Sequence, residues 1–358
     1  MLVLGDGMNH TGSFYYLVLL WAAILYGAGV VFKFGSVFLY EALMPWFSED
    51  KPKPKAETKT PMPPAKWVLW TALGVYLLLS GIVAIPPQVA LATQSQLLHL
   101  PDIASQAGLG RGLAHAWVSA WSLHPITYNI VVFMFQAVLG IFLLTEHDTL
   151  LGRITLVLTI VWGLFVAVFP QGLGLLFSGR DSLLAGAPGS GLLTAFLAWL
   201  LMIPSPRWRT GRIQHTASRV GAVVLGLGAL WQLTCFAPQR LYRQYPHQPA
   251  LVQPHFLWST ITSLRTVSLH DTIWLNTLWV LVFVTAAGAM WQYRHTILVW
   301  VASILWLLVW WIGQDFGLTA QFGLALNTAP LWAMWLWFLH AASDHHGVHT
   351  AKLSKTRS

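Results

Sequence analysis

Long apolar runs, separated by short polar segments, occupy most of this chain. A run of about 18 or more apolar residues is typical of a helix that crosses a bilayer, because about 20 residues span the hydrocarbon core. The runs lack the alternation of barrel strands, and backbone in lipid must satisfy its own hydrogen bonds, so helices are expected. The pattern predicts an all-α polytopic membrane protein with about nine transmembrane helices. The expected spans are 14–32, 67–85, 126–145, 153–172, 190–204, 218–237, 272–291, 296–313 and 328–342.

Short polar landmarks occur twice along the chain, in the same order and at similar spacing. They are Pro87-Gln88 and Pro238-Gln239, Ser122-Leu123-His124 and Ser268-Leu269-His270, Gln171-Gly172-Leu173-Gly174 and Gln314-Asp315-Phe316-Gly317, and Pro188 and Pro330. Each repeat then contains four spans, so both repeats enter the membrane from the same side. The expected architecture is two fused four-helix units in parallel orientation, related by a pseudo-twofold axis along the membrane normal.

The basic residues predict an orientation for these spans. Loops on the cytoplasmic side of a membrane carry an excess of Lys and Arg, and the segment from Ser48 to Lys66 is rich in Lys and Pro. This segment is therefore expected inside, with the N-terminus outside and the C-terminus inside. The expected parts are an N-terminal transmembrane anchor at 1–47, a cytoplasmic linker at 48–66, the first unit at 67–204, the second unit at 218–342 and a His-rich cytoplasmic tail at 343–358.

The composition agrees with a membrane protein and excludes several other classes. The chain of 358 residues is 56% hydrophobic and only 9% charged, whereas a soluble domain has about 25% charged residues. Its net charge of +8 comes from short loops rather than from one basic face, so no nucleic-acid partner is expected. The single cysteine, Cys235, leaves no pair for an intramolecular disulfide or a cysteine zinc site.

Two repeat-equivalent histidines, His124 and His270, are expected at the outer ends of the third and seventh spans. Such a pair can donate a hydrogen bond to a quinone carbonyl, or ligate a haem or a metal ion. The structural alternative is an interfacial histidine that precedes its helix, with Pro125 at the first helical position. Asp271 follows His270 where the first repeat has Pro125, and this acid can orient the ring or share its proton.

Gln171 and Gln314 open the polar glycine motif that ends the fourth and eighth spans. A carboxamide both donates and accepts hydrogen bonds, which suits a quinone or a polar head group. The structural alternative is a helix C-terminal cap followed by an outer hairpin. Asp315 adds an ionisable group at a membrane boundary, which is a functional candidate. We expect His124, His270, Gln171, Gln314, Asp271 and Asp315 to converge around an extracytoplasmic ligand-binding cavity between the two units.

The repeated unit also resembles a known family. A four-helix unit with a long outer first loop, the stretch "HPITYNIVVFMFQAVLGIFLL" from His124 and the stretch "GRITLVLTIVWGLFV" from Gly152 resemble the DoxX-like membrane proteins over about 67–342. This family includes the small subunit of thiosulfate:quinone oxidoreductase. The resemblance implies a bacterial cytoplasmic (inner) membrane, a quinone ligand and membrane or periplasmic redox partners. The family has Gly-Glu-x-Phe-Gly at the outer motif, where this chain has Gln171 and Gln314.

Three functions fit these features. The first is a membrane subunit or accessory protein of a respiratory or periplasmic redox system, with a quinone or another apolar ligand at the extracytoplasmic face. The second is a transporter or permease with its site between two parallel repeats, which requires a continuous polar path across the bilayer. The third is a structural subunit without a ligand, whose apolar surface and separate first span serve assembly. A haem or metal at His124 and His270 is an alternative to the quinone, and the sequence does not decide whether the chain is an enzyme.

Overall fold

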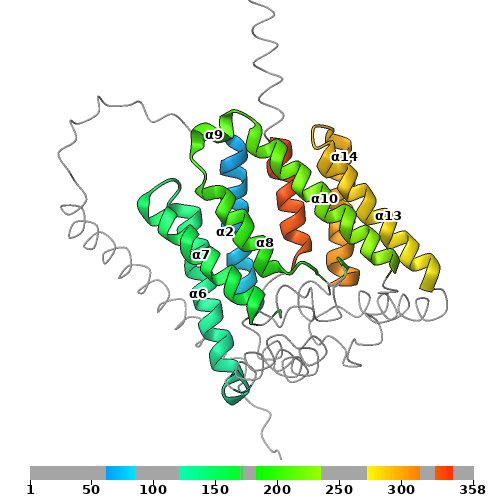
Figure 1. The fold of residues 1–358 in the computed structure, drawn as a ribbon. Coiled ribbons are helices and arrows are strands. Elements are labelled where there is room, and N and C mark those ends of the chain that lie inside the picture. Colours follow the sequence, from blue (N-terminus) through cyan, green and yellow to red (C-terminus); the bar gives the residue numbers. More distant parts are fainter. Residues whose placement is uncertain are drawn as a thin grey trace, which may run out of the picture. The chain divides into compact units, whose positions relative to one another are not determined.

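The computed structural model describes residues 62–84, 119, 121–169, 171, 183–184, 186–234, 272–314 and 327–341. Within these ranges every regular element is a helix (Figure 1). The helices are α2 (Pro64–Ala84), α6 (Pro125–Thr145), α7 (Leu150–Val168), α8 (Ser190–Met202), α9 (Ser205–Arg209), α10 (Arg212–Thr234), α13 (Thr272–Trp291) and α14 (Thr296–Leu308). The π-helical turn η1 (Val309–Gly313) continues α14, and a last helix covers 329–341, drawn in orange-red in Figure 1.

The predicted spans agree with these helices wherever the structure describes the chain. Within the described residues, six helices are long and apolar enough to cross a membrane, so this is a multi-pass membrane protein. The predicted spans 190–204 and 328–342 are short helices. α8 has 13 residues and is therefore about 20 Å long, against about 30 Å for a hydrocarbon core. The predicted span 14–32, most of the linker and the tail at 343–358 lie outside the described residues.

Glycines allow neighbouring helices to meet at their backbones, which is how helices associate closely in lipid. A Cβ atom on Gly163 of α7 would lie 2.7 Å from the carbonyl oxygen of Gly191 in α8. A Cβ atom on Gly140 of α6 would lie 2.8 Å from the carbonyl oxygen of Gly74 in α2. The pairs α2–α6 and α7–α8 are therefore held in backbone contact, and α10 packs against α13 in the second half of the chain.

Stacked aromatic rings join the two halves. Trp306 of α14 stacks on Trp332, with ring centroids 5.8 Å apart, and Trp332 stacks on Trp335 at 5.1 Å. Trp335 then stacks on Phe196 of α8 at 4.9 Å. Tryptophans commonly lie at the membrane interface, but these three are buried in the helix core. Their buried surface and ring contacts stabilise the packing of these helices.

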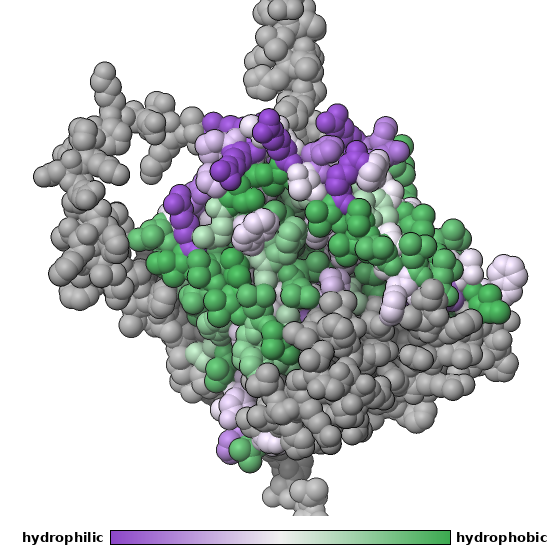
Figure 2. Space-filling model, viewed as in Figure 1, coloured by the Kyte–Doolittle hydropathy of each residue, from purple (hydrophilic) through white to green (hydrophobic). Residues whose placement is uncertain are grey.

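The charged residues of the described ranges lie in the connections and the adjoining helix turns at one end of the helices. They are Lys66, Glu146, Asp148, Arg153, Arg207, Arg209, Arg212, Arg219 and Arg294. Figure 2 shows hydrophilic residues gathered at this end, above an apolar surface. We refer to it as the charged end.

The short helix α9 and the turn at Gly211, with φ 72°, lie at the charged end. α10 begins at Arg212, six residues before the predicted start at 218, because Gln214 donates a hydrogen bond to the Trp208 carbonyl and holds the first turn.

Lys66 corrects the predicted extent of the linker. α2 begins at Pro64, and the Lys66 side chain is only 3% exposed. Its ammonium donates to the Asp148 carboxylate at 3.0 Å and to the Ser205 hydroxyl at 3.1 Å, and Ser205 in turn donates to Asp148 at 3.1 Å. The network ties α2, the α6–α7 turn and α9 together. Lys66 is thus part of the folded unit rather than of a flexible segment.

Asp148→Asn is expected to destabilise the protein more than Lys66→Met. The asparagine leaves the Lys66 charge buried without its counter-charge, whereas Asp148, with 36% of its side chain exposed, can be hydrated when Lys66 is lost. We expect a loss of about 2–3 kcal/mol for Asp148→Asn and about 1 kcal/mol for Lys66→Met, measured as unfolding free energies in detergent. Glu146→Gln, in the same turn, is the control, since that carboxylate accepts from the Thr149 hydroxyl. An equal or larger loss for Lys66→Met would contradict this account.

Candidate functional site

Gln171 connects the end of α7 to the beginning of α8. Its backbone N–H donates to the Val166 carbonyl, a π-type bond that widens the last turn of the helix. The side-chain Nε2 donates to the Ser190 hydroxyl at 2.9 Å, and Oε1 accepts from the Gly191 N–H at 3.1 Å. The N-cap residue of α8, Gly189, has no side chain to satisfy these first N–H groups. Gln171 therefore supplies the cap from the preceding helix.

Gln314 makes the same contacts in the second half of the chain. Its N–H donates to the Val309 carbonyl, its Nε2 donates to the Thr328 hydroxyl at 3.0 Å, and its Oε1 accepts from the Ala329 N–H at 3.0 Å. Nε2 also lies 3.4 Å from the Leu183 carbonyl oxygen. Both glutamines are fully buried. The matching bonds agree with the equivalence predicted for the two glutamine motifs.

The same contacts revise one landmark of the expected repeat. The residues that receive the glutamine side chains are Ser190 and Thr328. Pro188 lies two residues before α8, whereas Pro330 is the second residue of helix 329–341. The two prolines therefore do not occupy equivalent positions. Ser190 and Thr328 are instead the residues that correspond in the two sets of glutamine contacts.

Capping explains why a carboxamide stands at these positions. Each side chain donates through nitrogen to a hydroxyl and accepts through oxygen from a backbone N–H. An ionised carboxylate can only accept, so it can keep the hydroxyl contact only if the hydroxyl turns and donates instead. The contacts thus favour a structural role for Gln171 and Gln314. The cap differs from the predicted C-terminal cap, because each glutamine bonds to the N-terminus of the following helix.

The other predicted site residues are placed only in part. His124 is exposed at the N-cap of α6, and its side chain makes no capping hydrogen bond. His270, Asp271 and Asp315 lie outside the described residues. Among the described members, His124 lies at an exposed helix start and the two glutamines lie at separate buried helix junctions. The convergence of all six stays a prediction.

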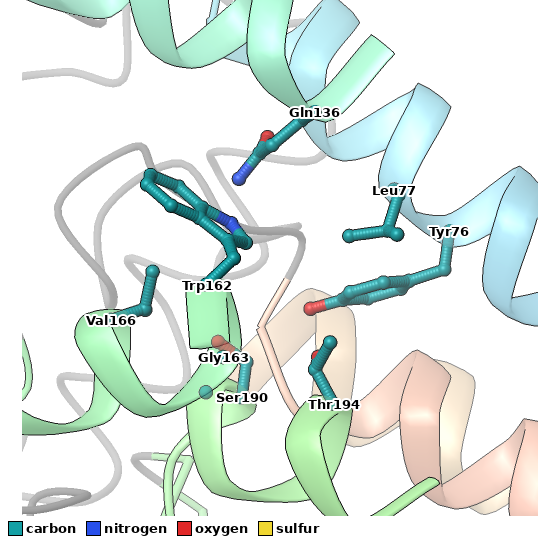
Figure 3. A pocket seen from close by; sticks show the side chains of 9 residues that line it. Tyr76, Leu77, Gln136, Trp162, Gly163, Val166, Ser190 and Thr194 are labelled. Carbon is teal, nitrogen blue, oxygen red and sulfur yellow. The ribbon is translucent and has the colours of Figure 1, made fainter. Parts of the chain in front are cut away.

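A small polar pocket lies beside the Gln171 cap, among α2, α6, α7 and α8 (Figure 3). Four polar side chains from three helices line it: Tyr76 of α2, Gln136 of α6, and Ser190 and Thr194 of α8. Its remaining walls are Leu77, Trp162, Gly163, Val166 and Gly191. About 10 Å³ is open to water-sized spheres, roughly the room that one water needs. No charged side chain belongs to this lining.

Tyr76 links the pocket to the second half of the chain. Its hydroxyl donates to the Asn327 carbonyl at 3.0 Å, in the turn that precedes helix 329–341. The hydroxyls of Ser190 and Thr194 lie around the same phenol oxygen, which points toward them in Figure 3. Ser190 also accepts from Gln171. One chain of polar contacts therefore connects the capping glutamine, the pocket and the turn at Asn327.

These pocket residues are not among the predicted site residues, although the sequence contains a signal for them. Tyr76 and Gln136 are isolated polar residues within apolar runs, and polar groups inside membrane spans are expensive and often functional. Asn129 lies seven residues before Gln136, on the same face of α6, and its buried amide has no hydrogen-bond partner in this structure. In the second half, by contrast, Gln232 and Asn276 bond to each other. Isolated polar residues within the predicted spans therefore indicated the pocket better than the repeated outer motifs did.

The fold and the pocket define a multi-pass, all-helical class of membrane protein with an uncharged polar pocket among its helices. No family model, curated protein or solved structure matches this chain.

Proposed function

We propose that this protein is an integral membrane subunit that binds the polar head of a neutral, lipid-soluble molecule of the quinone class in the Tyr76–Gln136–Ser190–Thr194 pocket. We further propose that it serves a respiratory or periplasmic redox system of a bacterial inner membrane, with its charged end on the cytoplasmic side. The observation that carries the proposal is the convergence of four neutral polar side chains and one indole on a narrow pocket between apolar helices.

The hydrogen-bonding capacity of the pocket suits a quinone and its reduced form. The Gln136 amide and the Ser190 and Thr194 hydroxyls can donate to a carbonyl oxygen, and the Tyr76 oxygen can accept from a quinol hydroxyl. The pocket admits about one oxygen-sized atom, so we place only the carbonyl or hydroxyl oxygen in it, with the ring against Trp162. An apolar wall with a few fixed polar groups is the usual form of such sites.

A second candidate, transport between parallel repeats, has less support. Transport of an ion or a charged solute needs polar or ionisable groups along its path, and the described charges lie at one end of the helices. The pocket residues lie close together rather than along a path, since Ser190 and Thr194 are only one helical turn apart in α8. The third candidate, a structural subunit without a ligand, is tested by the quinone-binding experiment described next.

Binding of a short-chain quinone to the purified protein tests the proposal, measured by quenching of tryptophan fluorescence in detergent. Thr194→Val removes a pocket hydroxyl with little change of shape and is expected to weaken binding about three- to tenfold, the value of one hydrogen bond. Thr159→Val is the matched control, because that buried hydroxyl bonds to the Thr155 carbonyl of its own helix. Equal affinities for the wild type and both variants, or no binding at all, would refute the pocket as a quinone site.

A further inference from the structure

The corner between α9 and α10 carries an unusual excess of positive charge. The described stretch from Gly186 to Thr234 contains Arg207, Arg209, Arg212 and Arg219 and no acidic residue. The two acids within the described ranges, Glu146 and Asp148, lie in the α6–α7 turn, and Asp148 is paired with Lys66. Among the described residues, Arg212 and Arg219 of this corner have no carboxylate partner.

Arg219 lies deeper in the bundle than the rest of the corner. It follows Arg212 by seven residues on the same helix, which places it about 10 Å further along the axis. Its guanidinium carbon is 3.2 Å from the centroid of the Trp291 ring of α13. Stacking covers one face of the guanidinium and leaves its N–H edge able to bind an oxyanion. An arginine held in this way is preorganised for a phosphate, which it can bind through two parallel hydrogen bonds.

An apolar stripe continues from the arginines along the outside of α10. Val220, Val223, Leu227 and Leu230 are 40%, 54%, 60% and 61% exposed. Their spacing of three and four residues puts them on one helix face, together with Arg212 and Thr216. The face thus begins with positive charge and continues with exposed aliphatic side chains, over about 27 Å of helix from Arg212 to Leu230. Figure 2 shows this change from hydrophilic to hydrophobic surface below the charged end.

We propose that this face binds an anionic phospholipid, with its phosphodiester between Arg212 and Arg219 and an acyl chain along Val220, Val223, Leu227 and Leu230. The positive charge matches the phosphate, and the stripe matches a chain that free phosphate lacks. Basic sites at helix ends near a membrane surface bind acidic lipid heads, and each Lys or Arg contributes about 1 kcal/mol. This site is separate from the quinone pocket, and the inference does not rest on the proposed function.

Native mass spectrometry of the full-length protein in detergent tests the proposal, with equal amounts of phosphatidylglycerol and phosphatidylcholine added. We expect the wild type to retain phosphatidylglycerol in preference to phosphatidylcholine, and Arg219→Gln to reduce that preference about fivefold. Arg153→Gln is the matched control, since Arg153 is an exposed arginine at the same charged end but on α7. It should leave the preference unchanged.

A second variant keeps the test decisive if Arg219→Gln does not fold. Arg212→Gln changes an exposed residue at the first position of α10 and should also reduce the preference. The proposal is overturned if the wild type retains both lipids equally, or if the folded α10 variants match the wild type. It is also overturned if inorganic phosphate at millimolar concentration displaces the lipid, because the site would then recognise free phosphate rather than a lipid.

Discussion

Gly163→Leu is expected to separate α7 from α8 and to cost about 3 kcal/mol or more of unfolding free energy. A Cβ atom at Gly163 would lie 2.7 Å from the Gly191 carbonyl oxygen and 2.9 Å from the Ala195 nitrogen. Both neighbours are backbone atoms of α8, so no rotamer change can relieve the clash. Because Gly163 and Gly191 also line the pocket, quinone binding should be lost together with thermal stability, measured in the same detergent.

Gly226→Leu and Gly288→Leu are the matched controls. A Cβ atom at either glycine would meet nothing within 4 Å, and both glycines lie within helices. Leucine has a higher helix propensity than glycine by about 0.8 kcal/mol, so these variants should be as stable as the wild type or slightly more stable. A similar loss for all three substitutions would show that added volume in lipid, rather than the backbone contact, causes the effect.

Gln314→Glu is expected to destabilise the protein by about 2.5–3.5 kcal/mol at pH 8, the cost of a charged side chain in a membrane. An ionised carboxylate cannot donate to the Thr328 hydroxyl, a bond that Gln314 makes at 3.0 Å. A protonated acid can donate and accept in the same geometry as the amide. The loss should therefore be much smaller at pH 5 than at pH 8, as measured by thermal unfolding at the two pH values.

The glutamine pair also tests the repeat. If Gln171 and Gln314 occupy equivalent positions, Gln171→Glu should show the same loss at pH 8 and the same recovery at pH 5. Gln292→Glu, in the exposed turn between α13 and α14, should change stability little at either pH. A loss for Gln314→Glu that does not depend on pH would contradict the capping account, because it would show that the donated bond is not the cause.

The helices could be predicted from the sequence because a bilayer imposes one simple requirement, an apolar run of sufficient length. The starts of α2 and α10 were predicted less well. Lys66 and Gln214 are polar residues that the hydropathy pattern assigns to water, but specific partners, Asp148 and the Trp208 carbonyl, hold them inside the fold. Such pairings join residues that are distant along the chain or depend on a particular turn, and a local pattern does not contain them.

The polar groups of the site were predicted in type but not in arrangement. The repeated motif pointed to Gln171 and Gln314, yet their bonds to Ser190 and Thr328 depend on how the next helix returns. Tyr76 and Gln136 come from helices α2 and α6 and meet α8 only in the folded unit. The sequence contains each residue, but three-dimensional packing decides which of them face one another.

The hydrogen bond from Tyr76 to the Asn327 carbonyl has a consequence for biogenesis. Its two residues are 251 positions apart, and a ribosome adds about 5–20 residues per second. About 10–50 s therefore separate the synthesis of Tyr76 from that of its acceptor. During that interval the Tyr76 phenol needs other partners, and the hydroxyls of Ser80, Ser190 and Thr194, which lie around it in the folded chain, are all made before Asn327. Tyr76 therefore reaches its partner in the folded chain only after the turn at Asn327 has been made, so the polar contacts of the pocket are completed late in synthesis.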